Sequence, residues 1–562
     1  MSRLVEWMLR FSAAAEARTF ESATREPAAA QERILHDLLK TNAATAFGRA
    51  HGFAHIANAH EYVRAVPLSD YEAVRPYMNR VIAGERNVLT VDTPEMFAAT
   101  SGTTAKPKLI PVTARSRAQN AAMTRMWLAR AIRDHRGGVA HKALTIVSPA
   151  VEGLNANGKP YGAMSGITYR RIPWIVRRHS ALPYALALIA DYQTRYFLAM
   201  RIAMAQRVSM IATPNPSTFL RLARVADENA AKIIRAIHDG EPGIAEWSFS
   251  ALAGEATSEL LASMKPDRAR ARFLEQVINR TGHLRPREVW PELQLIGCWL
   301  GGSAGFQADQ LTEFYGDVPR RDLGLWASEG RMTLPLADDT ASGVLAVHAN
   351  FYEFIPEENA EGTPPRTLRA HQLERGRRYC LVISAANGLY RYNMNDIVEV
   401  TGFYNRTPLL AFVRKGGDMA SITGEKIHLN QVQCAIEQAE RAVNTRLHQF
   451  RIIPDLAHRR YELLVEFSGA MEICRRDNFL HEFDRALAAQ NREYASRRAS
   501  RRLDSPKLWE MRPGWSDRVA REDFRAGKRE AQYKWRHLVQ QWDPISRAEI
   551  ADPTPPPSAF AS

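Results

Sequence analysis

The sequence predicts an α/β protein in which a large N-terminal domain is followed by a smaller α+β domain. First, the chain has 562 residues, and domains beyond ~250–300 residues tend to split into more than one core. Second, short apolar runs alternate with helical patterns between Phe97 and Val413, which indicates β-sheets flanked by helices. Third, the segment 414–418 interrupts the pattern and is typical of a hinge or domain boundary. We therefore expect domains at 1–413 and 414–551, and a tail at 552–562.

The elements of the N-terminal domain follow from apolar spacing. In the first fifty residues, apolar side chains from Leu4 to Phe11 recur at the spacing of one helical face, which predicts helices. Segment 216–236 has the same spacing and is expected to form a single helix. Apolar runs bounded by polar turns predict strands at 96–99, 108–112, 143–147, 293–300, 379–384 and 410–413.

The C-terminal domain has strand patterns before helical ones. Residues 461–467 alternate apolar and polar side chains, and Phe450 and Ile452 do the same, which predicts strands. Apolar positions at 480, 483 and 487 then predict an amphipathic helix. The proline-rich tail from Asp552 onward is expected to be disordered.

The amino-acid composition argues against several classes of protein. Hydrophobic residues make up 45% and charged residues 24% of the chain, which is ordinary for a soluble globular protein. The four cysteines are far apart and form no CxxC pair, which argues against a disulfide framework or a zinc site and fits a reducing compartment. No apolar run approaches the ~18–20 residues of a membrane span. These features predict a cytoplasmic protein with no membrane partner.

The formal net charge of +14 raises the question of nucleic-acid binding. Arginines gather at 492–502, and nucleic-acid binders often show such clusters. However, no nucleic-acid module is recognisable, and a helix with a solvated arginine face has the same composition. We expect no nucleic-acid partner, and instead a positive field that attracts small anionic substrates.

Residues 100–108 (TSGTTAKPK) carry the clearest chemical signal in the chain. They lie between two predicted strands and combine a glycine, several hydroxyls and two lysines. Backbone N–H groups, hydroxyls and ammonium groups in such a loop bind oxyanions, although an ordinary polar hairpin turn would have the same composition. The loop is not a Walker A motif. The groups available in this loop are the hydroxyls of Ser101, Thr103 and Thr104, the backbone N–H of Gly102 and the ammonium group of Lys108.

Two later carboxylates complete a nucleotide site. Glu329 lies in segment 325–330, before an apolar run, and is expected at a strand end. A single carboxylate that faces a polyphosphate is a typical Mg²⁺ ligand, whereas alone it would be a surface glutamate. Asp396 is expected just before a strand, where it could accept hydrogen bonds from both ribose hydroxyls; alone it would be a turn aspartate.

Taken in order, these motifs resemble a known family. The loop at 100–108 resembles the signature [ST]SGT[ST]GxPK of acyl-adenylate-forming enzymes, with Ala105 in place of a glycine. The ordered set resembles the Gretchen Hagen-type, auxin-responsive acyl acid amido synthetases, as a bacterial-type member, over nearly the whole chain. The other segments that carry the resemblance are 45–53, 162–166, 325–330, 390–403, 422–426 and 527–534.

The resemblance implies an adenylating N-terminal domain, a mobile C-terminal cap and an active site between them. It implies that ATP and a small carboxylic acid form acyl-AMP and pyrophosphate, with Mg²⁺, and that the amine of an amino acid then displaces AMP. The implied catalytic residues are Lys534, which would enter during adenylation, Glu329 and Lys108. Further implied nucleotide contacts are Gly301, Gly302, Ser303, Trp326, Ala327, Ser328, Asp396 and Arg414. We expect a monomer or a weak homodimer.

Two departures from the family pattern are visible. Many members carry a tyrosine that stacks on adenine where this chain has Leu325, so Trp326 or another aromatic residue would have to stack instead. Asn395 stands where plant relatives often carry a glycine before the aspartate, which affects the local geometry expected around the ribose. For the acyl group, the aromatic candidates are Tyr161, Trp174, Tyr184 and Phe219.

Other functions remain open at the level of sequence. An acyl-CoA ligase would use the same adenylation step with a thiol acceptor. Residues 301–305 match GxSxG after a predicted strand, which is the context of a hydrolase nucleophile at Ser303. The histidines that could serve such a hydrolase are His348, His371, His428 and His448. A non-catalytic adenylate-binding protein is a third alternative, which the presence of Glu329 and Lys534 disfavours.

Overall fold

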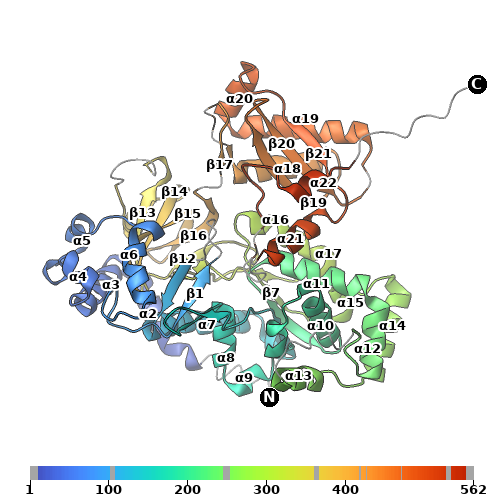
Figure 1. The fold of residues 1–562 in the computed structure, drawn as a ribbon, viewed down its shortest axis with the longest axis horizontal. Helices are drawn as coiled ribbons and strands as arrows, with labels where there is room; N and C mark the ends of the chain where they lie inside the picture. The colour runs from blue at the N-terminus through green and yellow to red at the C-terminus, as the bar shows by residue number, and fades with distance from the viewer. Residues whose placement is uncertain are drawn as a thin grey trace, which may run out of the picture. The chain divides into compact units, whose positions relative to one another are not determined.

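The computed structural model describes residues 11–100, 108–244, 254–359, 366–416, 419–423, 425, 427–469, 471–526, 533 and 535–551. The chain divides into two compact units, the first ending at Val413 and the second beginning at Arg414. Helices and sheets are mixed in both units (Figure 1). Among the described residues, no helix has both the length and the apolar character needed to cross a bilayer.

The first unit contains many helices (Figure 1), and its described residues form four sheets. Its α-helices are α2 (Ala14–Arg25), α3 (Pro27–Asn42), α4 (Ala46–Ala50), α5 (Ala59–Ala65), α6 (Tyr71–Ile82), α7 (Ala114–Asp134), α8 (Met164–Arg171), α9 (Trp174–Arg177), α10 (Tyr192–Met204), α11 (Pro216–Glu228), α12 (Ala230–Asp239), α13 (Gly254–Ala262), α14 (Arg268–Thr281), α15 (Pro286–Val289), α16 (Ser303–Asp309) and α17 (Leu311–Tyr315). Its 3₁₀ helices are η1 (Phe53–His55), η2 (Arg136–Val139), η3 (Tyr184–Leu188), η5 (Glu357–Asn359) and η6 (Ala370–Gln372).

The largest sheet has six strands in the order β11-β12-β16-β15-β14-β13. The strands are β11 (Thr333–Leu334), β12 (Gly343–Leu345), β13 (Phe351–Pro356), β14 (Arg378–Ala385), β15 (Leu389–Tyr404) and β16 (Thr407–Lys415). The N-terminal helices α3 to α6 share one apolar core with this sheet, and Figure 1 shows them beside β13 and β14. Within that core, Phe47 stacks on Tyr390 with ring centroids 4.9 Å apart. This packing fixes β15, which carries Asp396.

A second sheet is parallel and buried. It has the order β3-β6-β7-β8, from β3 (Lys142–Thr145), β6 (Val208–Ala212), β7 (Leu295–Gly297) and β8 (Arg320–Arg321), and each pair is parallel. Helices α10, α11, α12 and α14 pack with it in one core. Parallel strands covered by helices are typically near-continuous apolar runs, and β6 has this pattern except for the buried Ser209.

A third sheet holds the hairpin that carries the 101–107 loop. Its order is β2-β1-β5-β4, from β1 (Met96–Thr100), β2 (Lys108–Val112), β4 (Gly153–Leu154) and β5 (Pro160–Gly162). Thr113 follows β2 and caps α7, because its side chain accepts from the Ser116 backbone N–H at 3.2 Å. The hairpin is therefore anchored directly to a long helix.

Three predictions about this unit need correction. Segment 216–236 is two helices, because α11 ends at Glu228 and Asn229 bonds back to the Val225 carbonyl through Nδ2 at 2.9 Å. The strand expected at 293–300 is only Leu295–Gly297, since the Trp299 N–H bonds to the Pro214 carbonyl at 2.9 Å instead of continuing the ladder. Strand 143–147 likewise ends at Thr145. The predicted strands 96–99 and 108–112 are confirmed, the first with Thr100 added.

The second unit is a small α+β fold. Its strands are β17 (Met419–Ala420), β18 (Ile427–His428), β19 (Leu447–Asp455), β20 (Arg460–Phe467) and β21 (Lys507–Glu510), and its helices are α18 (Leu429–Ala442), α19 (Ile473–Gln490), α20 (Arg492–Ala499), α21 (Trp515–Arg525) and α22 (Pro544–Ala548). The main sheet has the order β19-β20-β21. Ile453 and Leu464 of this sheet share a core with Trp515 and Val519 of α21. The predicted tail at 552–562 lies outside the described residues.

Candidate active site

The hairpin β1–β2 frames the predicted phosphate loop. Thr100 pairs with Lys108 in the antiparallel register, so residues 101–107 connect the paired ends of two strands. Ser101, Gly102, Thr103 and Thr104 themselves lie outside the described residues. On its other edge β1 pairs with β5, with Ala98 opposite Gly162. The segment 162–166 is therefore brought next to the strand that leads into the loop.

Lys108 is held beside α6 at the start of β2. Its Nζ lies 5.3 Å from the ring centroid of Tyr71, a cation–π geometry. The next residue, Leu109, donates its backbone N–H to the Tyr71 hydroxyl at 3.0 Å. These two contacts with Tyr71 orient Lys108 at the base of the loop.

Glu329 lies in a tight turn directly before the strand that begins at Gly330, so it is at a strand end as expected. The short strands β9 (Trp326–Ala327) and β10 (Gly330–Arg331) form a hairpin whose two turn residues are Ser328 and Glu329. The Glu329 carbonyl accepts a hydrogen bond from Asn387 Nδ2 at 2.9 Å. Asn387 is 2% exposed, and its Oδ1 has no hydrogen-bond partner within the part of the chain that the structure describes. A buried oxygen acceptor thus lies beside the turn that carries Glu329.

Asp396 lies inside β15 and not before a strand as expected. The register pairs Cys380 with Ile397 but Val382 with Asn393, so residues 394–396 bulge opposite a single residue of β14. Asn395 has φ +54°, which asparagine tolerates better than most residues. Its N–H bonds to Asn393 Oδ1 at 2.8 Å. Asn395 therefore adopts the left-handed conformation that a glycine would favour, and the bulge re-aims Asp396.

Tyr392 links these separate segments. It is 4% exposed, and burial raises its pKa, to which the nearby charges of Glu329, Asp70 and Asp396 add. The backbone bridge between Ser69 and Tyr392 places the start of α6 beside β15, and the charges of Glu329 and Asp396 lie near enough to this phenol to act on the same pKa. The phenol stays protonated at neutral pH and keeps a hydrogen to donate.

Asp322 fixes two other segments of the predicted site. Its carboxylate accepts from the backbone N–H groups of Leu300 and Gly324, both at 2.6 Å. These residues precede Gly301 and Leu325. Burial raises the pKa of Asp322 to about 7, against the lowering effect of those two N–H groups and of Arg331.

The glycine pair at 301 and 302 has a packing reason. A Cβ on Gly301 would lie 2.9 Å from the Phe412 carbonyl oxygen, and one on Gly302 would lie 2.9 Å from the Phe412 ring. Gly302 also has φ +56° and precedes Ser303, the first residue of α16. The glycines allow close approach to β16, a constraint the sequence alone did not reveal.

Trp326 is the candidate for stacking on adenine, and an arginine already lies over its ring. The guanidinium carbon of Arg331 lies 5.2 Å from the Trp326 ring centroid. Arg331 is buried, and it donates to the Leu323 carbonyl and to Thr124 Oγ1, both at 2.8 Å. Trp326 is thus stacked on a fixed arginine, and Ala327 follows it in β9.

Among the acyl candidates, Phe219 is wrong. It is fully buried in the core around α11, against Tyr315, so it cannot line a substrate pocket. Trp174 is 68% exposed at the surface. Tyr184 uses its hydroxyl to accept from the Ala150 N–H at 2.7 Å, and Tyr161 lies in β5. Tyr161 and Tyr184 therefore stay as candidates for the acyl pocket, in or near the sheet that contains the β1–β2 hairpin.

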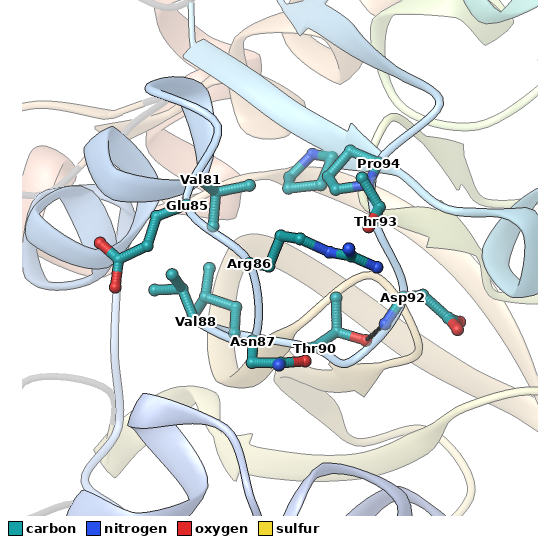
Figure 2. Close-up of a pocket in the computed structure, with 11 residues that line it drawn as sticks. Val81, Glu85, Arg86, Asn87, Val88, Thr90, Asp92, Thr93 and Pro94 are labelled. Carbon is teal, nitrogen blue, oxygen red and sulfur yellow. Dashed lines mark hydrogen bonds between the residues drawn. The ribbon is translucent and has the colours of Figure 1, made fainter.

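A surface pocket elsewhere in the first unit is too small for a substrate. Figure 2 shows it under the loop of residues 85–94, with Arg86 extending towards Thr90 and Thr93. Its enclosed volume is about 10 Å³, which holds about one water molecule. Its wall includes Leu89, whose carbonyl accepts from the Tyr390 hydroxyl at 2.7 Å. The pocket therefore backs onto β15 without forming the site.

In the second unit, the described part of the site is limited. Arg414 is buried, and its Nη1 donates to the carbonyls of Lys415 at 3.0 Å and Gly416 at 3.4 Å. Lys534 lies outside the described residues, although both of its neighbours are described.

Sequence reasoning missed Tyr392, Asn387 and Asp322. Tyr392 stands four residues before Asp396, and Asn387 precedes a glycine between two strands, so each had a local signal. Asp322 had none, because its partners Leu300 and Gly324 are joined only in three dimensions.

Models of three protein domains match this chain. The GH3 family N-terminal domain matches residues 16–320, the central domain 343–415 and the C-terminal domain 430–542. The chain belongs to the GH3 family. The central GH3 domain covers five of the six strands of the largest sheet, β12 to β16, and the C-terminal GH3 domain covers most of the second unit.

Similar GH3 proteins come from plants. The indole-3-acetic acid-amido synthetase GH3.15 of Arabidopsis thaliana is 25% identical over 433 residues, 73% of this chain and 71% of that protein. The jasmonoyl–L-amino acid synthetase JAR4 of Nicotiana attenuata is 21% identical over 464 residues, 79% of each. The solved structure of GH3.15 acyl acid amido synthetase superposes with a TM-score of 0.83 at 20% identity over 95% of both chains. The fold of this chain is therefore the GH3 fold.

Proposed function

We propose that this protein is an ATP-dependent acyl acid amido synthetase that works through an acyl-adenylate. In the first half-reaction, a carboxylate oxygen attacks the α-phosphorus of ATP and pyrophosphate leaves. In the second, the nitrogen of an amine attacks the acyl carbon, AMP leaves with the former carboxylate oxygen, and the amine loses a proton. The observation that carries the proposal is that the chain belongs to the GH3 family, and the charges of Glu329 and Asp396, which both act on the pKa of Tyr392, agree with it.

The charges in the first half-reaction explain the residue types. The carboxylate and the α-phosphate are both anions, and at ~4 Å with an effective dielectric of ~20 one charge pair repels by ~4 kcal/mol. Positive groups must offset this repulsion and follow the charge onto the departing pyrophosphate. Lys108, at the base of the 101–107 loop, has the charge and the anchoring for this role.

Magnesium fits the oxygen donors of the site. Mg²⁺ in nucleotide sites takes one or two carboxylates plus phosphate oxygens and waters. The Glu329 carboxylate would hold it, and the buried Oδ1 of Asn387, beside the same turn, adds a hard oxygen donor for a water or the ion. When bound, the ion would neutralise polyphosphate charge.

The other roles follow from position. Asp396, aimed by its bulge, would accept from the ribose hydroxyls. Ser101, Gly102, Thr103 and Thr104 would bind phosphates, and Lys534 would join them during adenylation. Gly301, Gly302, Ser303, Ala327, Ser328 and Arg414 would line the nucleotide.

The substrates we propose are a small carboxylic acid and an amino acid, in the cytoplasm. The relatives' names, indole-3-acetic acid-amido and jasmonoyl–amino acid synthetase, support this class. The test is ATP–pyrophosphate exchange over a panel of carboxylic acids, followed by product mass with amino acids or with coenzyme A. Acid-dependent exchange with an amide product supports the proposal, and a thioester product would make the protein an acyl-CoA ligase.

Replacing Glu329 tests the metal role. Glu329→Ala should lower the exchange rate steeply and raise the Mg²⁺ concentration needed for half-maximal rate, because a carboxylate ligand is lost. Glu313→Ala, which removes a surface glutamate of α17 with a 58% exposed side chain, is the matched control. A normal exchange rate at low Mg²⁺ in Glu329→Ala would contradict the assignment of Glu329 as a Mg²⁺ ligand.

A further inference from the structure

The chain on both sides of Lys534 is anchored in the core of the second unit. Ile452 in β19 donates its N–H to the His537 carbonyl at 2.6 Å, and Val539 donates to the Ile452 carbonyl at 3.2 Å. Residues around Leu538 thereby pair in parallel with the edge of β19. Trp535 is 8% exposed, and its indole N–H bonds to the Phe450 carbonyl at 2.8 Å.

On the N-terminal side of the lysine, Tyr533 is held by a different element. Its hydroxyl donates to Asp523 of α21 at 3.1 Å, and its ring packs edge-on against Phe524 with centroids 4.8 Å apart. The residues directly before and after Lys534 are therefore both fixed within one compact unit.

Arg451 binds the backbone next to the lysine. This residue of β19 is 5% exposed. Its Nε donates to the carbonyl of Arg536 at 3.1 Å, and its guanidinium lies 4.3 Å from the centroid of Trp535. One side chain thus contacts the first and second residues after Lys534.

The same guanidinium also contacts α21 and the start of α22. Trp515 of α21 lies 5.6 Å away, and Nη1 donates to Asp543 at 2.6 Å and to Ser546 Oγ at 3.3 Å. Ser546 in turn accepts from the Trp515 indole N–H at 2.9 Å. Arg451 therefore joins α21, α22 and the segment after Lys534.

The chemistry of this cluster requires arginine. Burial lowers the pKa of Arg451, and the charge of Asp543 counters this effect. Burying a cation with a single carboxylate is costly, so a core made for stability alone would favour apolar residues. Only a planar guanidinium combines a forked set of donors with stacking on aromatic faces.

We propose that Arg451 is a positioning residue for Lys534. It holds the backbone and the indole of the two residues that follow the lysine, and adenylation would depend on this anchored segment. The proposal rests on the proposed function, in which Lys534 serves the first half-reaction only. Loss of Arg451 should therefore harm that half-reaction selectively.

The experiment measures both half-reactions in Arg451→Met and Arg451→Lys. Pyrophosphate exchange should fall by at least tenfold in both variants, since lysine keeps the charge but lacks the fork and the stacking. Amide formation from preformed acyl-AMP should stay within about threefold of the wild-type rate, inside the tenfold that ~1.4 kcal/mol of barrier would give. Arg498→Met is the control, because Arg498 pairs with Asp484 in the same unit at 2.6 Å but bonds to α19 and the 503–505 loop. If Arg451→Met does not fold, Arg451→Lys alone carries the test.

A double-mutant cycle with Lys534→Ala separates positioning from general stability. If Arg451 acts through the lysine, its substitution should add little to the loss in exchange already caused by Lys534→Ala. Independent, multiplied losses, or equal damage to both half-reactions, would overturn the proposal. If Lys534→Ala leaves exchange normal, the role of the lysine in the proposed function fails, and this inference with it. If Lys534→Ala lowers exchange and Arg451→Met does not, only this inference fails.

Discussion

Two buried arginines, Arg391 in the first unit and Arg451 in the second, hold segments of the proposed active site in different ways. Arg391 is 4% exposed and donates from Nε and Nη2 to Glu353, which is 1% exposed. Its Nη1 donates to the carbonyls of Val63 and Val66 at 2.9 and 2.6 Å. Arg451 instead lies against two tryptophans, and its carboxylate partner Asp543 keeps a 34% exposed side chain.

We therefore call Arg391 a scaffold residue, because it supports a large core, and Arg451 a clamp, because it holds one local segment. Arg391 has φ +46° and lies at the first of two register shifts in β15, five residues before Asp396. Its ion pair is sealed in the core that joins the N-terminal helices to the large sheet. Arg451 joins elements at the edge of a smaller sheet. Breaking the first should cost global stability, whereas breaking the second should cost one catalytic step.

The largest expected effect is on stability in the first unit. Glu353→Gln leaves the buried Arg391 charge uncompensated and should lower the free energy of unfolding by about 3–5 kcal/mol. Urea unfolding measures it. The control is Glu374→Gln, which breaks an exposed pair with Arg377 and should cost under about 1 kcal/mol. Similar losses in the two variants would remove the distinction between scaffold and clamp.

The second largest effect is expected on the rate of the first half-reaction when Lys534 is replaced. Lys534→Ala should depress pyrophosphate exchange by ~10²-fold or more, the scale of one electrostatic contact to a developing charge. Supplied with preformed acyl-AMP, the variant should make amide at close to the normal rate. Equal damage to both steps would mean that the lysine is structural.

A smaller loss in the free energy of unfolding is expected at acidic pH. His537 is 1% exposed and buried against Phe450, and neither ring nitrogen has a hydrogen-bond partner among the described residues. Burial lowers its pKa from 6.5 to about 3. The unfolded chain therefore binds the proton first, so this stability is complete above pH ~6.5 and is lost as pH falls towards 3.

At pH 5.5, one unit below the unfolded value, the loss attributable to His537 should be about 1.4 kcal/mol. Unfolding of the wild type and of His537→Phe at pH 7.5 and 5.5 gives this value as the difference between their pH dependences. His348 in the first unit, whose pKa burial lowers to about 4, contributes equally to both proteins and cancels. Identical pH dependences would contradict the prediction.

The smallest effect is expected at Ser303. The substrate carboxylate is the nucleophile in the proposed reaction, so Ser303→Ala should leave acyl-AMP formation within roughly tenfold, under ~1.4 kcal/mol of barrier. Exchange and esterase assays on the same preparations measure this. An ATP-independent esterase activity that the substitution abolishes would favour the hydrolase alternative.

The sequence predicted the strands that frame the proposed site better than the local geometry of the residues in it. Local patterns placed the hairpin strands around 101–107 correctly, because alternation and turn residues are visible within a few positions. Asp396 was expected before a strand, since a bulge depends on the register with β14 and leaves no local mark. The role of Asp322, and the constraint of Phe412 on Gly301 and Gly302, come from contacts between distant segments that no window of sequence contains.

The central claim, that the acid is activated as an adenylate, is tested most directly with a carboxylate labelled with oxygen-18. The acid that supports exchange is incubated with ATP and the amine acceptor, and the AMP is analysed by mass. One labelled oxygen should appear in AMP for each amide formed, because the carboxylate oxygen bonds to the α-phosphorus and leaves with AMP. Label in inorganic phosphate with formation of ADP, or an amide formed without labelled AMP, would contradict the account.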